Sequence, residues 1–350
     1  MAFVHFASGE CTKSELDLFS LKPTQTSIEN SFFMEVLPLA ALTLLAVIEF
    51  FVSGSTAMYL DLNKTKANSA NIDDDAKVAL IAYPVTTMFN QVDINLGDRL
   101  VTQSDNMYAY RAYIESTLNY NCEALDTQLS AELFYKDTHA HFEDTALDGG
   151  NDGFKKRASF ATGSRRGDAE QYKLVILSAS LFVKRVKVST SVRLAHAEAL
   201  QLLNAKYAIE RVALKIFSIP AGTQLTQQQN LFMDQLPKLI IIGFVDHTAF
   251  SGLHTSNPFN FKHYDINYAA LVHEGAVIPA KLFTPSFETS NFVREYLGLV
   301  SITGKHLHDS GVVVSREGYG TGYTLFAFDL TPDMDDSDHY NLIKNGNQKA

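Results

Sequence analysis

Two pairs of histidines have a spacing that could bind a metal ion. In each pair one residue separates the imidazoles, so on a strand both would lie on the same face. A cupin-like β-barrel enzyme could use such imidazoles together with a nearby carboxylate. The residues concerned are His139 and His141 with Glu143, and His306 and His308 with Asp309. The spacing is common and both pairs lie in polar connections, so we favour surface histidines over metal ligands.

Two further motifs resemble ligand loops but lack the residues that the chemistry requires. The acidic run Asp333, Asp335, Asp336 and Asp338 resembles a calcium loop, yet Asp338 stands where the loop needs glycine and Lys344 where it needs glutamate. Gly318–Tyr323 (GYGTGY) lacks the GxGxxG spacing and precedes a strand pattern, so we expect a turn between two strands. No nucleophile motif is recognisable. The sequence therefore predicts no catalytic residue, no metal ligand and no cofactor, and the protein is not expected to be an enzyme.

Composition restricts the remaining classes. The chain has 350 residues, a length for which two domains are expected, and a net charge of −10. That charge argues against direct nucleic-acid binding through a basic surface. Cys11 and Cys122 are too few for a disulfide framework, which fits free thiols in a reducing compartment. The N-terminal residues lack the basic and apolar regions of a secretory signal.

The apolar stretch at residues 36–52 (VLPLAALTLLAVIEFFV) is interrupted at Glu49. About a dozen apolar residues precede that glutamate, whereas a membrane span needs about 20. We therefore expect buried strands here and no membrane span, although a membrane association of this stretch stays open.

Most other segments have the period of two that is typical of strands. Residues 92–101 predict a hairpin around Gly97, and Tyr172–Val188 predicts a long strand. Two segments have helical spacing instead: Met107 to Leu118, and Ser191–Ala205. The polar, partly basic residues 137–168, with Lys155, Lys156, Arg157, Arg165 and Arg166, read as a solvated loop rather than a contact with another subunit or with nucleic acid. A renewed alternation at Val212, Leu214 and Ile216 indicates another strand, and we place a domain boundary near residue 190.

The segment Asp246–Leu271 is rich in aromatic residues and predicts a long, curved strand. Phe259 and Phe261 alternate with polar residues, and Tyr264 and Ile266 do so again after the period shifts at His263. Such a shift is typical of a β-bulge.

Together with Pro237–Gly252 and Gly322–Asp333, this segment closely resembles the second jelly roll of double jelly-roll major capsid proteins. The resemblance is to the hexon-like capsid proteins of Maverick/Polinton-type elements and related large DNA viruses, which also occur as endogenous viral elements in animal genomes. It implies an all-β fold of tandem double jelly-roll β-sandwiches with a few short helices in loops: residues 1–190 as the first jelly roll and residues 191–350 as the second. It also implies a capsid subunit of the virion that forms homotrimers, with itself and other capsid proteins as partners, and that resides in the host cytoplasm or nucleus before assembly.

Some strands of that pattern are missing. Only a short bridge at Ser164–Glu170 stands where the resemblance expects further strands, and Asn63–Ile72 shows no alternation. We therefore expect an incomplete first jelly roll with open sheet edges, as in a truncated endogenous copy. Two alternatives stay open: a host-encoded β-sandwich protein that binds carbohydrate or protein, and the cupin-type metalloenzyme.

The resemblance and the patterns lead to three structural expectations. Residues 206–332 should form a β-sandwich of at least seven strands. Asn291–Val300 should be a short helix, because Phe292, Tyr296 and Val300 have helical spacing. The aromatic rings of Phe259, Phe261, Phe326 and Phe328 should be buried.

Overall fold

The computed structural model describes residues 25–38, 56–66, 79–160, 172–205, 210–331 and 348–349, apart from gaps at 97, 103–104, 229–230, 233–234, 254, 274, 307–308 and 310. The chain divides into two compact units. Unit 1 comprises residues 1–63 and 174–208, and unit 2 comprises residues 64–173 and 209–350. We predicted a boundary near residue 190 between two jelly rolls. The division into these two units does not test that boundary, so it stays a prediction.

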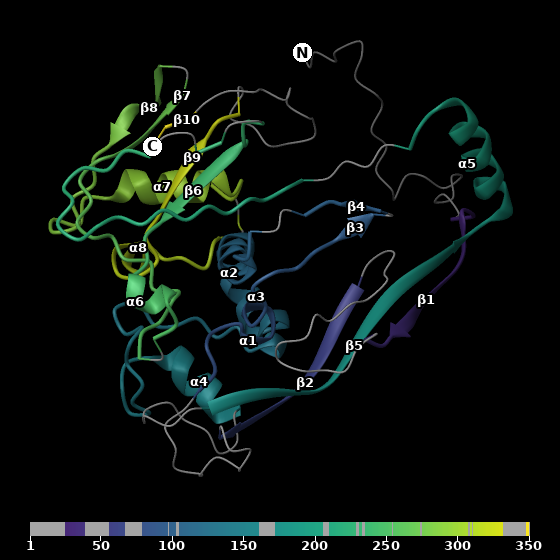
Figure 1. Ribbon diagram of the computed structural model, residues 1–350, viewed down its shortest axis with the longest axis horizontal. Helices are drawn as coiled ribbons and strands as arrows, with labels where there is room; N and C mark the ends of the chain where they lie inside the picture. Colours follow the sequence, from purple (N-terminus) through teal and green to yellow (C-terminus); the bar gives the residue numbers. More distant parts are fainter. Residues whose placement is uncertain are drawn as a thin grey trace, which may run out of the picture. The chain divides into compact units, whose positions relative to one another are not determined.

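Unit 1 is built on a three-stranded sheet in the order β1-β5-β2 (Figure 1). Its strands are β1 (Ile28–Val36), β2 (Thr56–Lys66) and the central β5 (Tyr172–Val188), which is followed by helix α5 (Thr190–Leu202). β1 pairs antiparallel with β5, with Val36 opposite Leu181 and Ser31 opposite Val186. Leu181 and Val183 are buried, so β5 supplies the core of this unit. The predicted long strand and the helix after it are both confirmed.

Unit 2 contains most of the remaining elements. Its helices are α1 (Pro84–Thr87), α2 (Tyr108–Asn119), α3 (Cys122–Asp126), α4 (Asp152–Phe160), α6 (His247–Phe250), α7 (Val293–Ile302) and α8 (Arg316–Gly320), with a 3-10 turn at Gln128–Glu132. Its strands are β3 (Asn95–Leu96), β4 (Arg99–Leu100), β6 (Leu239–Gly243), β7 (Ala269–His273), β8 (Ala276–Phe283), β9 (Leu325–Asp329) and β10 (Gln348–Lys349). β3 and β4 form the predicted hairpin. Helix α2 confirms the helix predicted from Met107 to Leu118, and helix α7 confirms the helix predicted over Asn291–Val300.

The core of unit 2 lies on both faces of β9, which pairs antiparallel with β6. Side chains alternate along a strand, so neighbouring residues point to opposite faces. Leu325 and Ala327 join a cluster with residues of α2 and α7, whereas Phe326 and Phe328 join a second cluster with Leu271 and Phe283 of β7 and β8. Figure 1 shows α7 beside β6 and β9. β9 is therefore covered on both faces. Phe259, Phe261, Phe326 and Phe328 are all at most 3% exposed, as expected.

The prediction of one long strand over Asp246–Leu271 is wrong. The Asp246 side chain accepts a hydrogen bond from the Thr248 backbone N–H at 2.9 Å and begins helix α6, and β7 starts only at Ala269. Between them Tyr264 and Asp265 have positive φ values of 47° and 50°, which turn the chain at the position where we expected a bulge. Local side-chain hydrogen bonds compete with a strand ladder, and in this segment they prevail.

The prediction of at least seven strands in residues 206–332 is also wrong for the described residues. That range contains β6, β7, β8 and β9, all in antiparallel pairs. The alternating residues around Leu214 belong to no helix or strand. The glycines at 318–322 likewise do not join two strands, because Gly318 and Gly320 lie in helix α8. The protein is rich in sheet with several short helices.

The prediction of a solvated loop over residues 137–168 needs correction as well. Asn151 accepts a hydrogen bond from the Phe154 backbone N–H at 3.1 Å, which satisfies one of the free N–H groups at the start of helix α4. Phe154 and Arg157 on that helix are buried. The polar composition concealed a helix that packs on one side.

Several predictions fall outside the described residues, in whole or in most of their length. These are the apolar stretch at 36–52, the missing strands at Asn63–Ile72 and Ser164–Glu170, the acidic run from Asp333, and Cys11. Cys122 is described and is a free, exposed thiol.

Candidate functional site

A buried ion pair joins helix α4 to the segment before it. The Arg157 guanidinium lies 2.5 Å from the Asp137 carboxylate, and the two side chains are 3% and 0% exposed. Arg157 also donates to the backbone carbonyls of Leu80, at 2.9 Å, and Tyr135. Isolated buried charges are costly, but here the hydrogen bonds and the opposite charge compensate one another.

The Asp137 carboxylate has two further donors, both amides. The Asn151 side chain donates to one oxygen at 2.9 Å, and the Asn257 side chain donates to the other at 2.8 Å. The backbone carbonyl of Asp137 accepts a hydrogen bond from the Tyr323 hydroxyl at 2.7 Å. We call Asp137, Asn151, Arg157, Asn257 and Tyr323 the polar cluster. It ties together three segments of the chain that lie far apart in sequence.

The tyrosines around the polar cluster are held in the protonated form. Burial raises the pKa of Tyr323 and of Tyr113 well above the ordinary value, and it raises the pKa of Tyr110 to about 12. Tyr113 stacks on Phe259 with ring centroids 4.1 Å apart. Because these phenols keep their protons near neutral pH, they can donate hydrogen bonds but are poor proton acceptors. The Tyr323 hydroxyl therefore serves as a hydrogen-bond donor that holds the Asp137 backbone carbonyl in place.

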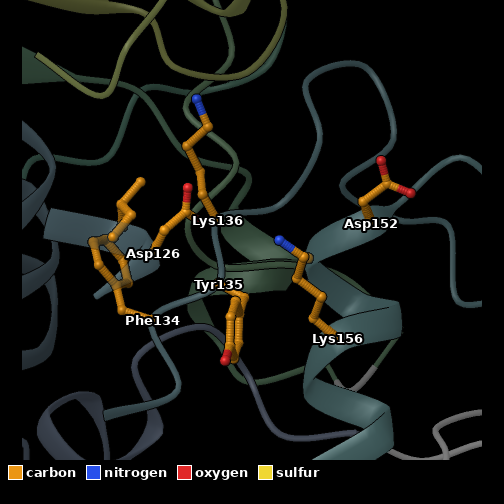
Figure 2. A pocket seen from close by; sticks show the side chains of 8 residues that line it. Asp126, Phe134, Tyr135, Lys136, Asp152 and Lys156 are labelled. Atoms are coloured by element: carbon orange, nitrogen blue, oxygen red, sulfur yellow. The ribbon is translucent and has the colours of Figure 1, made fainter. Parts of the chain in front are cut away.

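A shallow pocket lies between α3 and α4, beside the polar cluster (Figure 2). Its volume is about 140 Å³, and its lining consists of Leu125, Asp126, Phe134, Tyr135, Lys136, Asp152, Gly153 and Lys156. Sites for small molecules usually measure about 300–1,000 Å³. This pocket has room for one side chain of a partner, and its two lysines and two aspartates give it no net charge preference.

The two lysines of the pocket already have partners. The Lys136 ammonium donates to the Val313 carbonyl at 2.8 Å and lies 4.9 Å from the ring centroid of Tyr323, and burial lowers its pKa. The Lys156 ammonium lies 5.5 Å from the ring centroid of Tyr135. Figure 2 shows the side chains of both lysines beside the segment from Phe134 to Lys136. Their cationic groups thus stabilise aromatic rings of the protein itself.

The histidines predicted as possible metal ligands do not converge. His139 and His141 lie in a turn around Ala140, whose φ is 62°, and not on a strand. His139 lies 3.8 Å from Glu317, and His141 lies 3.8 Å from Asp144.

The carboxylates proposed with these histidines have other surroundings. Glu143 accepts hydrogen bonds from the Asn257 backbone N–H and the Asn260 side chain instead. His306 and Asp309 are described but His308 is not. Among the described residues, no three histidine, cysteine, aspartate or glutamate side chains are grouped closely enough to hold a metal ion.

Exposed large apolar side chains make up a larger share of the described residues in unit 1 than in unit 2. Helix α5 has no buried residue, and Leu202 on it is 85% exposed. On β1 the ring of Phe33 is 64% exposed. The exposed set in this unit is Ile28, Phe32, Phe33, Leu37, Met58, Leu177, Val186, Leu194, Leu200, Leu202 and Leu203. Exposed apolar side chains that gather on one surface mark a site that binds other molecules.

Sequence reasoning predicted neither the polar cluster nor the exposed surface. Asp137 and Asn257 are 120 residues apart, so no local spacing connects them. Leu194, Ala197 and Leu200 form an apolar stripe on α5 that the sequence shows, but the spacing does not tell whether such a stripe is buried or exposed. Of the helices in the described ranges, none combines the length and the apolar composition that crossing a membrane requires.

Comparisons with known proteins identify one relative in sequence and one solved structure with a similar fold. No family model matches the chain. The uncharacterized protein F54H12.2 of Caenorhabditis elegans is 22% identical over 379 aligned positions, which cover 93% of this chain and 89% of that protein. A chain in the cryo-EM structure of the Sputnik virophage is 10% identical, and the match covers 99% of this chain and 86% of that chain with a TM-score of 0.50. At this identity the likeness concerns the fold, so the chain has a fold similar to that of a protein of a virus particle.

Proposed function

We propose that the protein is a structural capsid subunit with a double jelly-roll fold, and that three copies form a hexon-like capsomer of an icosahedral shell. The observation that carries this proposal is the fold similarity to a Sputnik virophage chain, which extends over 99% of this chain. The resemblance of Asp246–Leu271 and its flanking strings to capsid sequences points the same way.

The surface chemistry supports assembly rather than catalysis. Unit 1 presents apolar side chains that would be buried between subunits, and obligate interfaces are rich in such side chains. In unit 2 the charged groups of the polar cluster bind one another, and the protonated tyrosines around them favour a scaffold over a catalyst. The net charge of −10 leaves contact with the genome to another protein.

The proposal extends to location and origin. The assembled protein would reside in a virion capsid and, before assembly, in the host cytoplasm or nucleus. The relative in Caenorhabditis elegans, which matches nearly the whole chain, supports an endogenous, Maverick/Polinton-type copy in an animal genome.

Light scattering after size exclusion, combined with electron microscopy of the purified full chain, tests the proposal. We expect a species with three times the mass of one chain and particles with three-fold symmetry. A chain that stays monomeric at tens of micromolar and forms no symmetric particle would contradict the proposed capsomer. Binding of an immobilised glycan by that monomer would favour the alternative of a carbohydrate-binding sandwich.

A further inference from the structure

One segment of unit 2 has the sequence pattern of a strand but no strand beside it among the described residues. Residues 211–219 (RVALKIFSI) belong to no helix, strand or turn, and Val212, Leu214 and Ile216 alternate with other residues. Among the described residues, the backbone groups of 211–219 make no hydrogen bond to another backbone group. Val212, Ile216, Phe217 and Ile219 are 39%, 44%, 42% and 41% exposed. Apart from the Leu214 N–H, this segment therefore offers backbone groups that have no partner among the described residues, together with exposed apolar side chains.

Side chains hold the centre of this segment in place. The Leu214 backbone N–H donates to the Asp105 carboxylate at 3.1 Å. The Lys215 ammonium donates to the Leu231 carbonyl and lies 5.0 Å from the ring centroid of Phe232. A segment that is already anchored loses less conformational entropy when another strand adds to it.

Strand β1 has the complementary properties. It lies at the edge of its sheet, so one side of its backbone is unpaired within the described residues. Phe32 and Phe33 are 49% and 64% exposed. Its two charged residues, Glu29 and Glu35, are acidic, whereas the two charged residues of 211–219, Arg211 and Lys215, are basic. Both segments have nine residues.

We propose that β1 of one copy adds to residues 211–219 of a second copy as an antiparallel strand, with Glu35 opposite Arg211. This register places Met34 opposite Val212 and Phe32 opposite Leu214, so apolar side chains meet on one face. On the other face Glu29 lies diagonal to Lys215. In this register Glu29 lies opposite Phe217. A shift by one residue would remove the Glu35–Arg211 pair and place Met34 opposite Arg211 or Phe32 opposite Lys215, which favours the proposed register.

The contact is head-to-tail, because each copy supplies β1 to one neighbour and residues 211–219 to another. Such contacts generate a closed ring if the rotation that relates one copy to the next adds up to a full turn over a whole number of copies. The inference rests on the proposed function, since a closed ring of three copies is the proposed capsomer, and it names the surfaces that form the contact.

Charge reversal tests the contact, with self-association of the full chain measured by analytical ultracentrifugation. Glu35→Lys and Arg211→Glu each place like charges opposite one another, and we expect either change to weaken self-association about tenfold. The double variant should recover the wild-type association. Lys281→Glu, the same reversal at an exposed position of β8, is the matched control and should associate like the wild type. All variants should keep the wild-type unfolding midpoint.

A mixture of the two single variants separates contacts between copies from contacts within one copy. The lysine introduced by Glu35→Lys in one chain would then meet the glutamate introduced by Arg211→Glu in the other, and the unchanged Glu35 and Arg211 would meet at a second contact. In a mixed ring of three, two contacts are then favourable and one pairs like charges, so an equimolar mixture should associate more strongly than either variant alone and less strongly than the double variant. Recovery in the double variant without any gain in the mixture would assign the pairing to a single chain and overturn the inference. Undiminished association of both single variants would also overturn it while leaving the proposed capsomer intact. A wild-type chain that does not associate would refute both.

Discussion

The two units differ in what their apolar side chains contact. In unit 2 the rings of Phe259, Phe261 and Phe326 lie in clusters that the unit itself supplies, and each is at most 3% exposed. In unit 1 a complete helix, α5, has no buried residue, and Phe33 is 64% exposed. A core that is closed on itself is stable without a partner, whereas exposed apolar surface gains its stabilisation only when something covers it. Assembly would provide that cover.

The ion pairs show the same contrast. Asp137 and Arg157 in unit 2 are buried and have several hydrogen-bond partners. Glu29 and Lys187 in unit 1 lie 2.8 Å apart, with side chains 40% and 65% exposed. Burial makes the first pair essential to the fold of unit 2, whereas solvent and salt weaken the second.

Truncation of a core ring should give the largest effect. Phe326→Ala leaves a cavity between β6, β9 and the β7–β8 sheet, and we expect it to lower the free energy of unfolding by about 3–5 kcal/mol. The matched change in unit 1, Phe33→Ala, should cost below about 1 kcal/mol when the chain is monomeric. Urea unfolding at low protein concentration measures both. Equal losses would mean that Phe33 is buried in the free chain.

Removal of the buried cation should have a comparable or slightly smaller effect. Arg157→Ala leaves the Asp137 carboxylate buried without its counter-charge, which costs about 3–5 kcal/mol. Arg185→Ala, at an exposed position of β5, is the control and should change the stability by no more than about 0.5 kcal/mol. A small loss for Arg157→Ala, measured by the same unfolding experiment, would show that the amide donors alone can hold Asp137.

The exposed ion pair should show the smallest effect, visible mainly in a titration. The hydrogen bond and the charge of Lys187 lower the pKa of Glu29. The stabilisation from this pair is therefore present above the ordinary pKa of glutamate and is lost as the pH falls through the lowered, folded-state pKa.

In an NMR titration, Lys187→Gln should raise the pKa of Glu29 towards its ordinary value, and so should salt at about 1 M. Lys184→Gln, also on β5 but not paired with Glu29, should have less influence. A pKa of Glu29 that does not respond to salt would indicate that this pair is shielded from solvent.

The sequence predicted those elements whose side chains follow one period throughout. β9 reads as apolar on both faces and is buried on both, and α2 and α7 have the three- and four-residue spacing of helices. The segment Asp246–Leu271 defeated the same reasoning because its conformation depends on the Asp246 side chain and on positive φ at Tyr264 and Asp265. Alternation alone does not report such local hydrogen bonds.

The polar cluster could not be predicted for a different reason. Arg157 looked like part of a solvated basic run, since composition does not reveal which of several neighbouring cations is buried. Its partner Asp137 is 20 residues away, and Asn257 and Tyr323 are farther still. Only the packed structure brings these groups together, so their roles follow from burial and not from spacing.

Hydrogen exchange of the full chain at two concentrations tests the central claim most directly. At a concentration where the chain is monomeric, we expect α2, α7 and β9 to be strongly protected, and β1 and α5 to exchange quickly. At a concentration where it assembles, β1 and α5 should gain protection while α2, α7 and β9 stay as they were. Equal and concentration-independent protection of both units, in a chain that remains monomeric at tens of micromolar, would contradict the account of unit 1 as a surface completed by assembly.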